Sequence, residues 1–451
     1  MSLVAGLDVG GSSVKAWVVG DGVLLAEATA ATTTLRPAPD RAELDPSAWE
    51  AAARRALTEA VGQVPGEYDG VTVSSLRQGF VLLGRDGEPL GPGVLNSDGR
   101  GASHAQVLAG RHGLTGHWPA AELTLPKLLH LRDAEPERWA ATARVLFVHD
   151  WLVQRLCGAQ VTEASYACAG GMADVVARDW AHDLLDDVGL GSDRLAPVVE
   201  AGTPVGALRP GWGLPGGVPV VAGCGDTQLA AAGVGGLADG VVTVVAGSST
   251  PVQAASAQPL LDPRGHGWVS THAARDRWAV EGNAGYPGTY QGWWQGLAPG
   301  DPAEGPGDLL AVTGVPEWSE AAWLRRGPVS LVGLQPDTTR ADVARALLEA
   351  HAYAVRGNVE DLERVVGRPA CAVVVCGGAV RDGALPRLLA TVLGRELHWA
   401  HGASAAALAG AALVSGRRPG LPQRTVPAGD PAPYDAPYAR WRAAVEGLRT
   451  S

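Results

Sequence analysis

A strand, a turn of glycine and serine, and a second strand occur twice in this chain of 451 residues. The first copy covers residues 4–19 and turns at Gly10-Gly11-Ser12-Ser13, and the second begins at residue 241 and turns at Gly247-Ser248-Ser249-Thr250. The copies lie half a chain length apart. Two halves that open in the same way predict two similarly built α/β lobes, residues 1–236 and 237–451, with a cleft between them.

Helical periodicity and short apolar runs alternate along the rest of the chain, as an α/β fold requires. Helices are predicted from Asp45 onwards and at 101–112, 124–133, 135–142, 149–157, 227–233, 342–365, 383–393 and 404–415. Strands are predicted at 71–75, 80–83, 218–222, 372–375 and 396–400. The tail beyond Arg417 is rich in proline and is predicted to wrap over the surface.

The charge balance argues against two classes of partner. Lysine and arginine total 36 against 47 aspartates and glutamates, a formal net charge of −11, so no positive excess is available for nucleic acid or an anionic membrane. No apolar run reaches the roughly 18 residues of a membrane helix, and Asp8 lies where a signal peptide would be apolar. We therefore expect a cytoplasmic protein whose oligomeric state stays open, with a homodimer as one alternative.

Lysine occurs at only two positions, Lys15 and Lys127, in a chain that otherwise uses arginine as its cation. An ammonium is a compact point charge, whereas a guanidinium is a planar fork. Chance is one explanation for the survival of these two lysines. The other is that both occupy places that require a small cation.

The first glycine turn has the composition of a phosphate-binding turn. Glycine lets backbone N–H groups approach an anion, and the hydroxyls of Ser12 and Ser13 with the ammonium of Lys15 would face phosphate oxygens. Asp8 would hold Mg²⁺ directly or through water. The alternative is an ordinary hairpin with a solvated lysine. The segment lacks the G-K-[ST] sequence of a Walker motif.

Two further glycine turns follow buried strands. One is Gly247-Ser248-Ser249, and the other is Gly377-Gly378-Ala379, where a base or ribose could lie against bare backbone. Each is weak evidence alone. Together with Gly10-Gly11 they are better explained by one nucleotide cleft than by three coincidences.

Asp226 is the candidate catalytic residue. It follows a continuous apolar strand and begins a helix of small residues, where free N–H groups and the helix dipole stabilise a carboxylate. An ordinary helix cap is the alternative. The glycines at 223 and 225 leave its flanks bare, which suits a carboxylate that accepts the proton of a hydroxyl during phosphoryl transfer.

Two polar segments are suited to sugar hydroxyls. Arg77 and Gln78 lie between two predicted strands, and Asp98 lies in the segment Asn96-Ser97-Asp98-Gly99-Arg100 after a turn rich in proline and glycine. The alternative for both segments is ordinary loop polarity.

Taken in order, these motifs resemble the FGGY carbohydrate kinases, and the resemblance covers nearly the whole chain. The matching segments are Gly6–Lys15, Asp98-Gly99-Arg100, Thr124-Leu125-Pro126-Lys127-Leu128-Leu129, Arg178-Asp179-Trp180, Val220–Asp226 and Gly377-Gly378-Ala379 with the leucines at 388, 389 and 393. The order of segments is most similar to that of xylulose kinases.

This resemblance implies the two-lobed, ribonuclease H-like fold of the actin-like ATPases. It implies Asp226 as the general base, Asp8 as a carboxylate linked to Mg²⁺, and Asp98 with Arg77 and Gln78 as sugar ligands. The residues implied to contact ATP are Gly10, Gly11, Ser12, Ser13, Lys15, Gly247, Ser248, Ser249, Gly377, Gly378 and Ala379.

Several positions depart from the family pattern. Arg77-Gln78 stands where xylulose kinases usually have Met-His, and Asn96-Ser97-Asp98 where they have Trp-Asn-Asp. The family's aromatic-Leu-x-Gly-Glu-Arg-x-Pro loop is absent, and residues 323–334 are interpreted as a shortened version of it. These departures lie on the sugar side and put the identity of the substrate in doubt.

The leading hypothesis is ATP-dependent phosphorylation of a hydroxyl of a small sugar, first a ketopentose such as xylulose. Glycerol, a tetritol, ribulose or a hexonate is the alternative substrate. A sugar-binding regulator without kinase activity is a hypothesis from another class. An actin-like ATPase that assembles or acts as a chaperone is disfavoured, because Arg77 and Asp98 would then have no evident purpose. The sequence suggests no role for Lys127.

Overall fold

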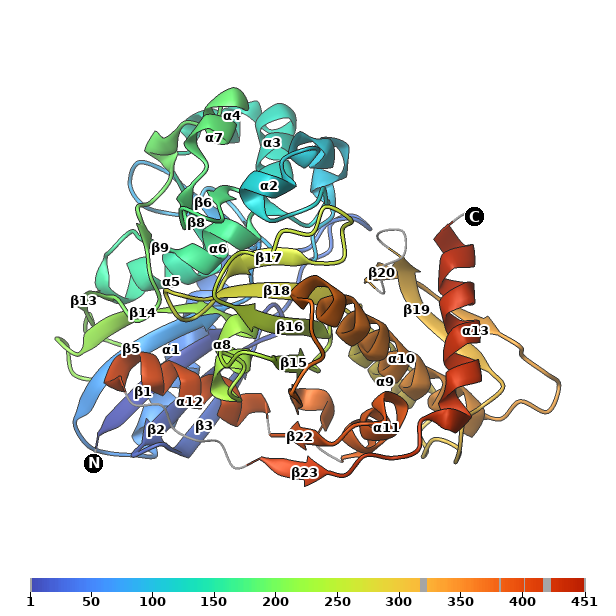
Figure 1. Cartoon of the computed structure of the whole chain (residues 1–451). Coiled ribbons are helices and arrows are strands. Elements are labelled where there is room, and N and C mark those ends of the chain that lie inside the picture. The colour runs from blue at the N-terminus through green and yellow to red at the C-terminus, as the bar shows by residue number, and fades with distance from the viewer. Residues whose placement is uncertain (1, 317–322, 381–382, 401, 417–422, 450–451) are drawn as a thin grey trace.

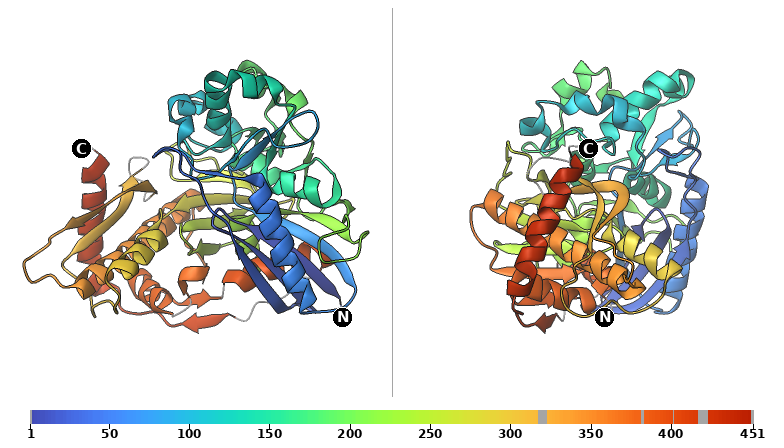
Figure 2. Two further views of the ribbon diagram at one scale, coloured as in Figure 1. Left: turned by 180° about the vertical axis from the view of Figure 1, so that it is seen from behind. Right: turned by 90° about the vertical axis from the view of Figure 1, so that its right-hand side faces the viewer.

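The computed structural model describes residues 2–316, 323–380, 383–400, 402–416 and 423–449 (Figure 1). Two mixed β-sheets lie at its centre, and helices pack against both. The view from behind in Figure 2 shows α1, Pro46–Gly62, lying across the strands of the N-terminal sheet. Among the described residues, no helix combines the length and the apolar character needed to cross a membrane.

The N-terminal sheet has six strands in the order β13-β14-β5-β1-β2-β3. Their bounds are β1 Leu3–Val9, β2 Ser13–Gly20, β3 Val23–Ala31, β5 Tyr68–Ser75, β13 Pro204–Ala207 and β14 Pro219–Gly225. The side chains of β1 and β5 are almost entirely buried, because the sheet is covered on both faces and its central strands read as continuous apolar runs.

The C-terminal sheet has seven strands in the order β17-β18-β16-β15-β21-β22-β23. Their bounds are β15 Val241–Val245, β16 Pro251–Ser256, β17 Trp268–Thr271, β18 Trp278–Asn283, β21 Ala372–Cys376, β22 Leu397–Trp399 and β23 Arg424–Val426.

The two sheets share one topology. The order β3-β2-β1-β5-β14 in the first corresponds to β18-β16-β15-β21-β22 in the second. In each, three neighbouring strands are antiparallel and two more join in parallel. The prediction of an α/β fold with two similarly built halves is therefore confirmed, while the boundary between residues 236 and 237 stays a prediction. Because parallel strands end at the same edge, the turns after β1, β5 and β14 gather at one edge of the first sheet.

Two helices of small residues connect the halves. α8, Asp226–Gly233, packs its Ala230 against Val374 of β21. α12, Gly402–Ser415, packs its Ala407 and Leu408 against Trp17 of β2. A side chain at Gly233 would stand 1.9 Å from the carbonyl oxygen of Ala405, so the two helices cross at a distance that only glycine allows.

The helix ends follow local sequence signals. The Asp45 carboxylate accepts the backbone N–H of Ser47 at 2.9 Å and begins α1, with Pro46 in its first turn. α10, Arg340–Val366, begins with a capping box between Thr339 and Asp342 and ends at Gly367, whose φ is +79°.

A layer of short helices lies above the first sheet in Figure 1. It comprises η1 Arg100–Leu108, α2 His112–Thr115, α3 Thr124–Ala134, α4 Pro136–Ala141, α5 Val148–Cys157, α6 Ala164–Ala169, α7 His182–Asp187 and η2 Ser192–Arg194. A four-stranded sheet accompanies it, made of β4 Glu43–Leu44, β7 Gly93–Val94, β6 Phe80–Leu83 and β8 Arg144–Phe147. Two short strand pairings complete this part, β9 Thr162–Glu163 with β12 Val198–Val199 and β10 Ala173–Asp174 with β11 Asp179–Trp180.

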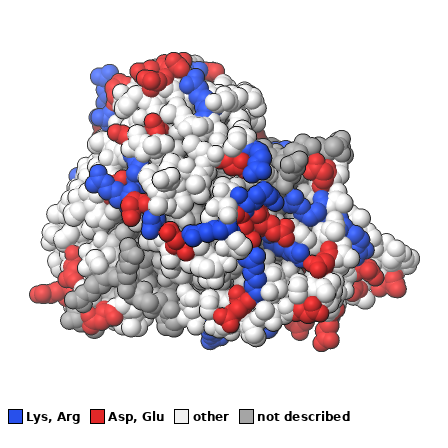
Figure 3. Space-filling model, viewed as in Figure 1, with Lys and Arg blue, Asp and Glu red and all other residues white. Residues whose placement is uncertain are grey.

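The remaining elements belong to the C-terminal half. They are α9 Pro287–Leu297, β19 Leu310–Pro316, β20 Leu324–Val332, η3 Gly378–Val380, α11 Ala384–Leu393 and α13 Ala432–Arg449. Lysine, arginine and acidic side chains lie close together across the face in Figure 3 rather than in separate areas of one sign.

Three sequence predictions are wrong in detail. The helix predicted over 101–112 is a 3₁₀ helix followed by the separate short helix α2. Beyond Gly416, the described residues of the tail form β23, which pairs with β22, and the helix α13, whose Trp441 is fully buried. Residues 323–334 are also not a loop, because most of the segment is the strand β20, paired with β19; that this region is shorter than in the family stays a prediction.

Candidate active site

Asp226 stands where β14 ends and α8 begins. Its Oδ1 accepts the backbone N–H of Thr227 at 2.7 Å and the Thr227 hydroxyl at 3.2 Å. Within the described part of the chain Oδ2 accepts no hydrogen bond. Burial raises the pKa of Asp226, while the Arg77 guanidinium and the bonds from Thr227 oppose that shift. The carboxylate therefore has one oxygen held and one available to accept a proton.

Gly225 leaves room for this arrangement. A side chain at position 225 would stand 2.9 Å from Cγ and Cδ of Arg77 and 2.7 Å from Oε1 of Gln228. The aliphatic part of Arg77 thus packs on the bare backbone just before Asp226. The bare flank predicted beside this carboxylate is present at Gly225, although Arg77 and not a ligand packs against it.

Asp226 lies between two cavities. The smaller has a volume of about 100 Å³ and the larger about 400 Å³. Five residues line both cavities: Asn96, Asp226, Thr227, Ser249 and Pro251. A group bound in one cavity and a group bound in the other would therefore meet at Asp226.

The larger cavity collects the three glycine turns from both sheets. Of the residues predicted to bind a nucleotide, it is lined by Gly10, Gly11, Ser12, Lys15, Gly247, Ser248, Ser249, Gly377 and Gly378. A side chain at Gly377, where φ is +115°, would stand 2.1 Å from the Ala246 carbonyl oxygen, so this turn requires glycine. The three turns therefore lie around one cavity, as the sequence predicted.

Two of the predicted nucleotide contacts do not line this cavity. The carbonyl of Ser13 accepts the N–H of Gly10 at 2.9 Å, and the N–H of Ala379 is donated to the carbonyl of Ala246 at 3.0 Å. Both residues use their backbone to shape the turns. The expectation that Ser13 and Ala379 contact the nucleotide therefore has no support in this geometry.

Asp8 faces the larger cavity from the end of β1. Its Oδ1 accepts the Ser74 hydroxyl at 3.2 Å. Burial and the negative charge of Asp226 raise the pKa of Asp8 to about 6, although Lys15 and Ser74 oppose the shift. A cation beside Asp8 and Asp226 would offset the negative charge of Asp226, which raises the proton affinity of Asp8. Among the described residues there is no cluster of three or more protein ligands that could hold a metal unaided.

An ion pair joins the two halves of the chain beside the smaller cavity. Nη1 and Nη2 of Arg77, after β5, donate to Oε2 and Oε1 of Glu281 on β18 at 2.9 and 2.8 Å. Gln253 also donates to Glu281. Burial alone would lower the pKa of Arg77, but Glu281 outweighs it and the pKa lies above its usual value. Arg77 lines the cavity with its charge already compensated.

Gln78 lines the same cavity and has a φ of +60°. This left-handed conformation is uncommon for a residue other than glycine. Further polar and aromatic residues surround the space. They are Asn96, Glu122, Trp268, Asn283, Tyr286, Trp323, Arg325 and Arg326.

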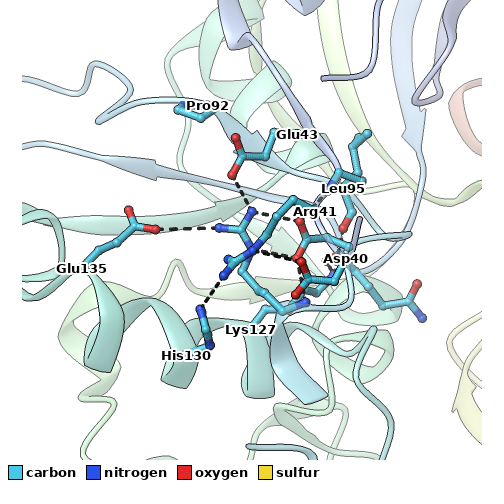
Figure 4. Close-up of polar contacts among 12 residues, drawn as sticks. Asp40, Arg41, Glu43, Pro92, Leu95, Lys127, His130 and Glu135 are labelled. Carbon is cyan, nitrogen blue, oxygen red and sulfur yellow. Dashed lines mark hydrogen bonds and ion pairs between the residues drawn. The ribbon is translucent and has the colours of Figure 1, made fainter. Parts of the chain in front are cut away.

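The prediction that Asp98 contacts the sugar is wrong. Asp98 is fully buried and lines neither cavity. Its Oδ2 accepts the N–H of Ala42 at 2.7 Å, and its two oxygens accept Nε and Nη2 of Arg100 at 2.7 and 2.9 Å. Burial would raise the pKa of Asp98, but the bonds from Arg100 lower it. This aspartate instead holds a structural ion pair with Arg100, which also pairs with Glu43. Glu43 is labelled in Figure 4.

Sequence reasoning missed several cavity residues. Glu281 is a single acidic residue in the apolar run of β18, a pattern that could have marked it as a partner for a buried cation. Glu122, Trp268 and Trp323 carry no signal of this kind, because tryptophans and loop carboxylates are common in ordinary cores and loops.

Family models match both halves of the chain. The N-terminal domain of the FGGY family of carbohydrate kinases matches residues 3–233, and the C-terminal domain of that family matches residues 266–417.

Individual proteins are similar over most of their length. A putative sugar kinase YoaC of Bacillus subtilis is 30% identical over 366 residues, 76% of this chain and 74% of its own length. The xylulose kinase of Escherichia coli is 28% identical over 434 residues, 91% of this chain and 89% of its own. The crystal structure of xylulose kinase from Rhodospirillum rubrum superimposes with a TM-score of 0.82 at 26% identity and covers 99% of both chains. The expected two-lobed actin-like fold is thereby confirmed.

The Arg77–Glu281 pair generates a prediction about stability. Arg77→Met and Glu281→Gln should each lower the free energy of unfolding by about 3 kcal/mol, because each leaves a buried charge unpaired. The double variant should lose less than the sum of the two, by at least about 1 kcal/mol. Denaturant unfolding of the four proteins measures this coupling.

The partly exposed pair Arg54–Glu50 serves as the control, with an expected coupling below about 1 kcal/mol. Additive losses from Arg77→Met and Glu281→Gln would show that the two charges do not depend on each other.

Proposed function

The chain belongs to the FGGY family of carbohydrate kinases, and we propose that it transfers the γ-phosphoryl group of ATP to a hydroxyl of a small sugar. The observation that supports this is the position of Asp226 between a small polar cavity and a larger cavity lined by three glycine turns. A phosphoryl acceptor on one side and a polyphosphate on the other would meet at this carboxylate.

The chemistry assigned to Asp226 is general base catalysis. The sugar hydroxyl lies against the available oxygen Oδ2 and passes its proton to it as the hydroxyl oxygen attacks the γ-phosphorus. The new bond joins that oxygen to phosphorus, and the bond from phosphorus to the bridging oxygen of ADP breaks. The raised pKa of Asp226 makes it a better proton acceptor than an exposed aspartate.

The glycine turns would hold the donor. The turns after β1 and β15 line the larger cavity with residues that include Ser12, Ser248 and Lys15, whose hydroxyls and ammonium suit phosphate oxygens. Mg²⁺ fits the mutually repelling carboxylates of Asp8 and Asp226, and when bound it neutralises phosphate charge.

The first candidate substrate is a ketopentose such as xylulose. Support comes from the similarity to xylulose kinases over nearly the whole chain. Gln78, Asn96 and Glu122 provide amide and carboxylate groups for hydroxyls, and the tryptophans offer apolar faces to a sugar ring or chain. Arg77 and Gln78 stand where xylulose kinases usually carry Met-His, so the hydroxyl pattern they select differs in detail.

A hexonate is the second candidate. The guanidinium groups of Arg325 and Arg326 line the smaller cavity from β20, and a guanidinium is well suited to a carboxylate. Glu122 on the cavity wall opposes an acidic substrate. The ketopentose therefore remains the first choice.

A substrate panel tests the proposal. ADP release is measured with Mg-ATP and xylulose, ribulose, glycerol, a tetritol or gluconate, and the largest kcat/KM is expected for a ketopentose. A larger value for gluconate would favour the hexonate. Sugar-induced thermal stabilisation without ADP release from any sugar would instead identify a sugar-binding regulator.

Asp226→Asn should reduce kcat by a factor of about 10² to 10⁴, the usual contribution of a general base. The amide keeps the shape of the carboxylate but cannot take the proton, so the KM for ATP and the thermal midpoint should change little. Asp45→Asn at the start of α1 is a surface control and should keep wild-type kcat. Wild-type turnover in Asp226→Asn would exclude the residue from proton transfer.

The charges around Asp8 predict a pH dependence. The rate should fall as the pH drops through about 6, since protonation removes the charge of Asp8. Lys15 lowers the pKa of Asp8 and Glu27 raises it. Lys15→Met should therefore move the acid limb of the kcat/KM profile to higher pH, and Glu27→Gln should move it to lower pH, each by roughly 0.5 to 1 unit. If both variants shifted the acid limb of the kcat/KM profile in the same direction, a group other than Asp8 would control that limb.

A further inference from the structure

Lys127 is fully buried on α3, in the T-x-P-K-L-L segment for which no role was found from sequence. Its Nζ donates to the carbonyl oxygen of Gln78 at 3.0 Å and to that of Leu95 at 2.9 Å. Figure 4 shows Lys127 and Leu95 in the same group of polar residues as Glu43 and Glu135. One amine therefore joins two loops that are separate in the sequence.

Both loops carry side chains that line the smaller cavity. Gln78 is itself a lining residue, and Leu95 is followed directly by Asn96, which lines both cavities. The distance between these two side chains depends on how the backbones of residues 78 and 95 are held. Lys127 holds both backbones but lines neither cavity.

Gln78 needs such support because its φ is +60°. A left-handed conformation outside glycine is strained and persists only where its surroundings hold it. Its carbonyl accepts a second hydrogen bond, from the Thr124 hydroxyl at 3.1 Å. Thr124 and Lys127, one turn apart on α3, thus both hold this carbonyl, while only Lys127 also reaches Leu95.

The surroundings of Lys127 suit an amine better than a guanidinium. Burial lowers the pKa of Lys127 to about 7, with Asp98 and Glu122 opposing the shift and Arg100 adding to it. A neutral amine keeps two N–H groups, which equals the number of carbonyl acceptors present. An arginine would stay charged and would bring a planar fork into a fully enclosed space.

We propose that Lys127 is a positioning residue for the sugar, holding the loops of Gln78 and Asn96 at the separation that the bound sugar requires. This inference rests on the proposed function in assigning the smaller cavity to the sugar. Lys127 acts through the two loops and has no part in proton transfer or in ATP binding.

The test uses the full-length chain with Lys127→Met, which keeps the volume and removes both donors. With the sugar identified by the substrate panel, the KM for sugar should rise at least tenfold and the KM for ATP should stay within twofold. Thr142→Val is the control for loss of a buried hydroxyl, since Thr142 donates to the carbonyl of Arg138 away from both cavities. It should leave both KM values unchanged. An unchanged KM for sugar in Lys127→Met would overturn the proposal.

Thr124→Val provides a milder and selective comparison. It removes one of the two bonds to Gln78 and none to Leu95, so the KM for sugar should rise only about threefold. This variant also keeps the test decisive should Lys127→Met fail to fold. A larger effect from Thr124→Val than from Lys127→Met would contradict the assigned roles.

Hydrogen exchange measured by mass spectrometry separates this inference from the proposed function, because it requires no substrate. Lys127→Met should speed exchange in peptides covering 76–80 and 94–98 and leave the strands β1 and β15 unchanged. Thr124→Val should speed exchange at 76–80 alone. Wild-type exchange at both loops in Lys127→Met would overturn the positioning role, whereas faster exchange in a chain that phosphorylates no sugar of the panel would count against the proposed function only.

Discussion

The buried pair between Arg77 and Glu281 is the interaction on which the site depends. It joins the turn after β5 to β18 and so connects the two sheets next to Asp226. The stem of Arg77 packs on Gly225, and its charge opposes the rise in the pKa of Asp226. A single side chain thus positions the carboxylate, tunes its proton affinity and forms part of the wall of the smaller cavity.

Arg77 can form part of the wall of the smaller cavity because Glu281 neutralises its charge. An unpaired guanidinium at this depth would be costly to bury and would hold the proton affinity of Asp226 down more strongly. With the pair in place, Asp226 keeps a raised pKa despite its cationic neighbour. The same pair draws the halves together at the point where the two cavities meet, so the assembly of the fold and the tuning of the proposed base rest on one contact.

Features of this structure that depend on neighbouring residues could be predicted from the sequence, whereas features that depend on residues far apart in the chain could not. The turns at Gly10 and Gly247 and the helix after Asp226 were predictable, because glycine spacing and apolar periodicity are local signals. Asp98 was misassigned because a carboxylate facing a sugar and one facing Arg100 look alike in sequence. Glu281 was missed because its partner is 204 residues away. The helix α13 was missed because the proline-rich start of the tail obscured the apolar residues beyond it, among them the buried Trp441.

The use of two lysines among so many arginines has a structural explanation. Three arginines, Arg77, Arg100 and Arg178, pair with carboxylates in forked geometry. Lys127 instead meets two backbone carbonyls from different loops, with no space for a planar fork. Lys15 lies opposite Asp8 in the β1–β2 register and faces the larger cavity. Each lysine stands where a small donor on a flexible stem meets backbone or an open cavity, whereas Arg77, Arg100 and Arg178 each meet a planar carboxylate. At these five positions the cation thus matches the shape of its acceptor.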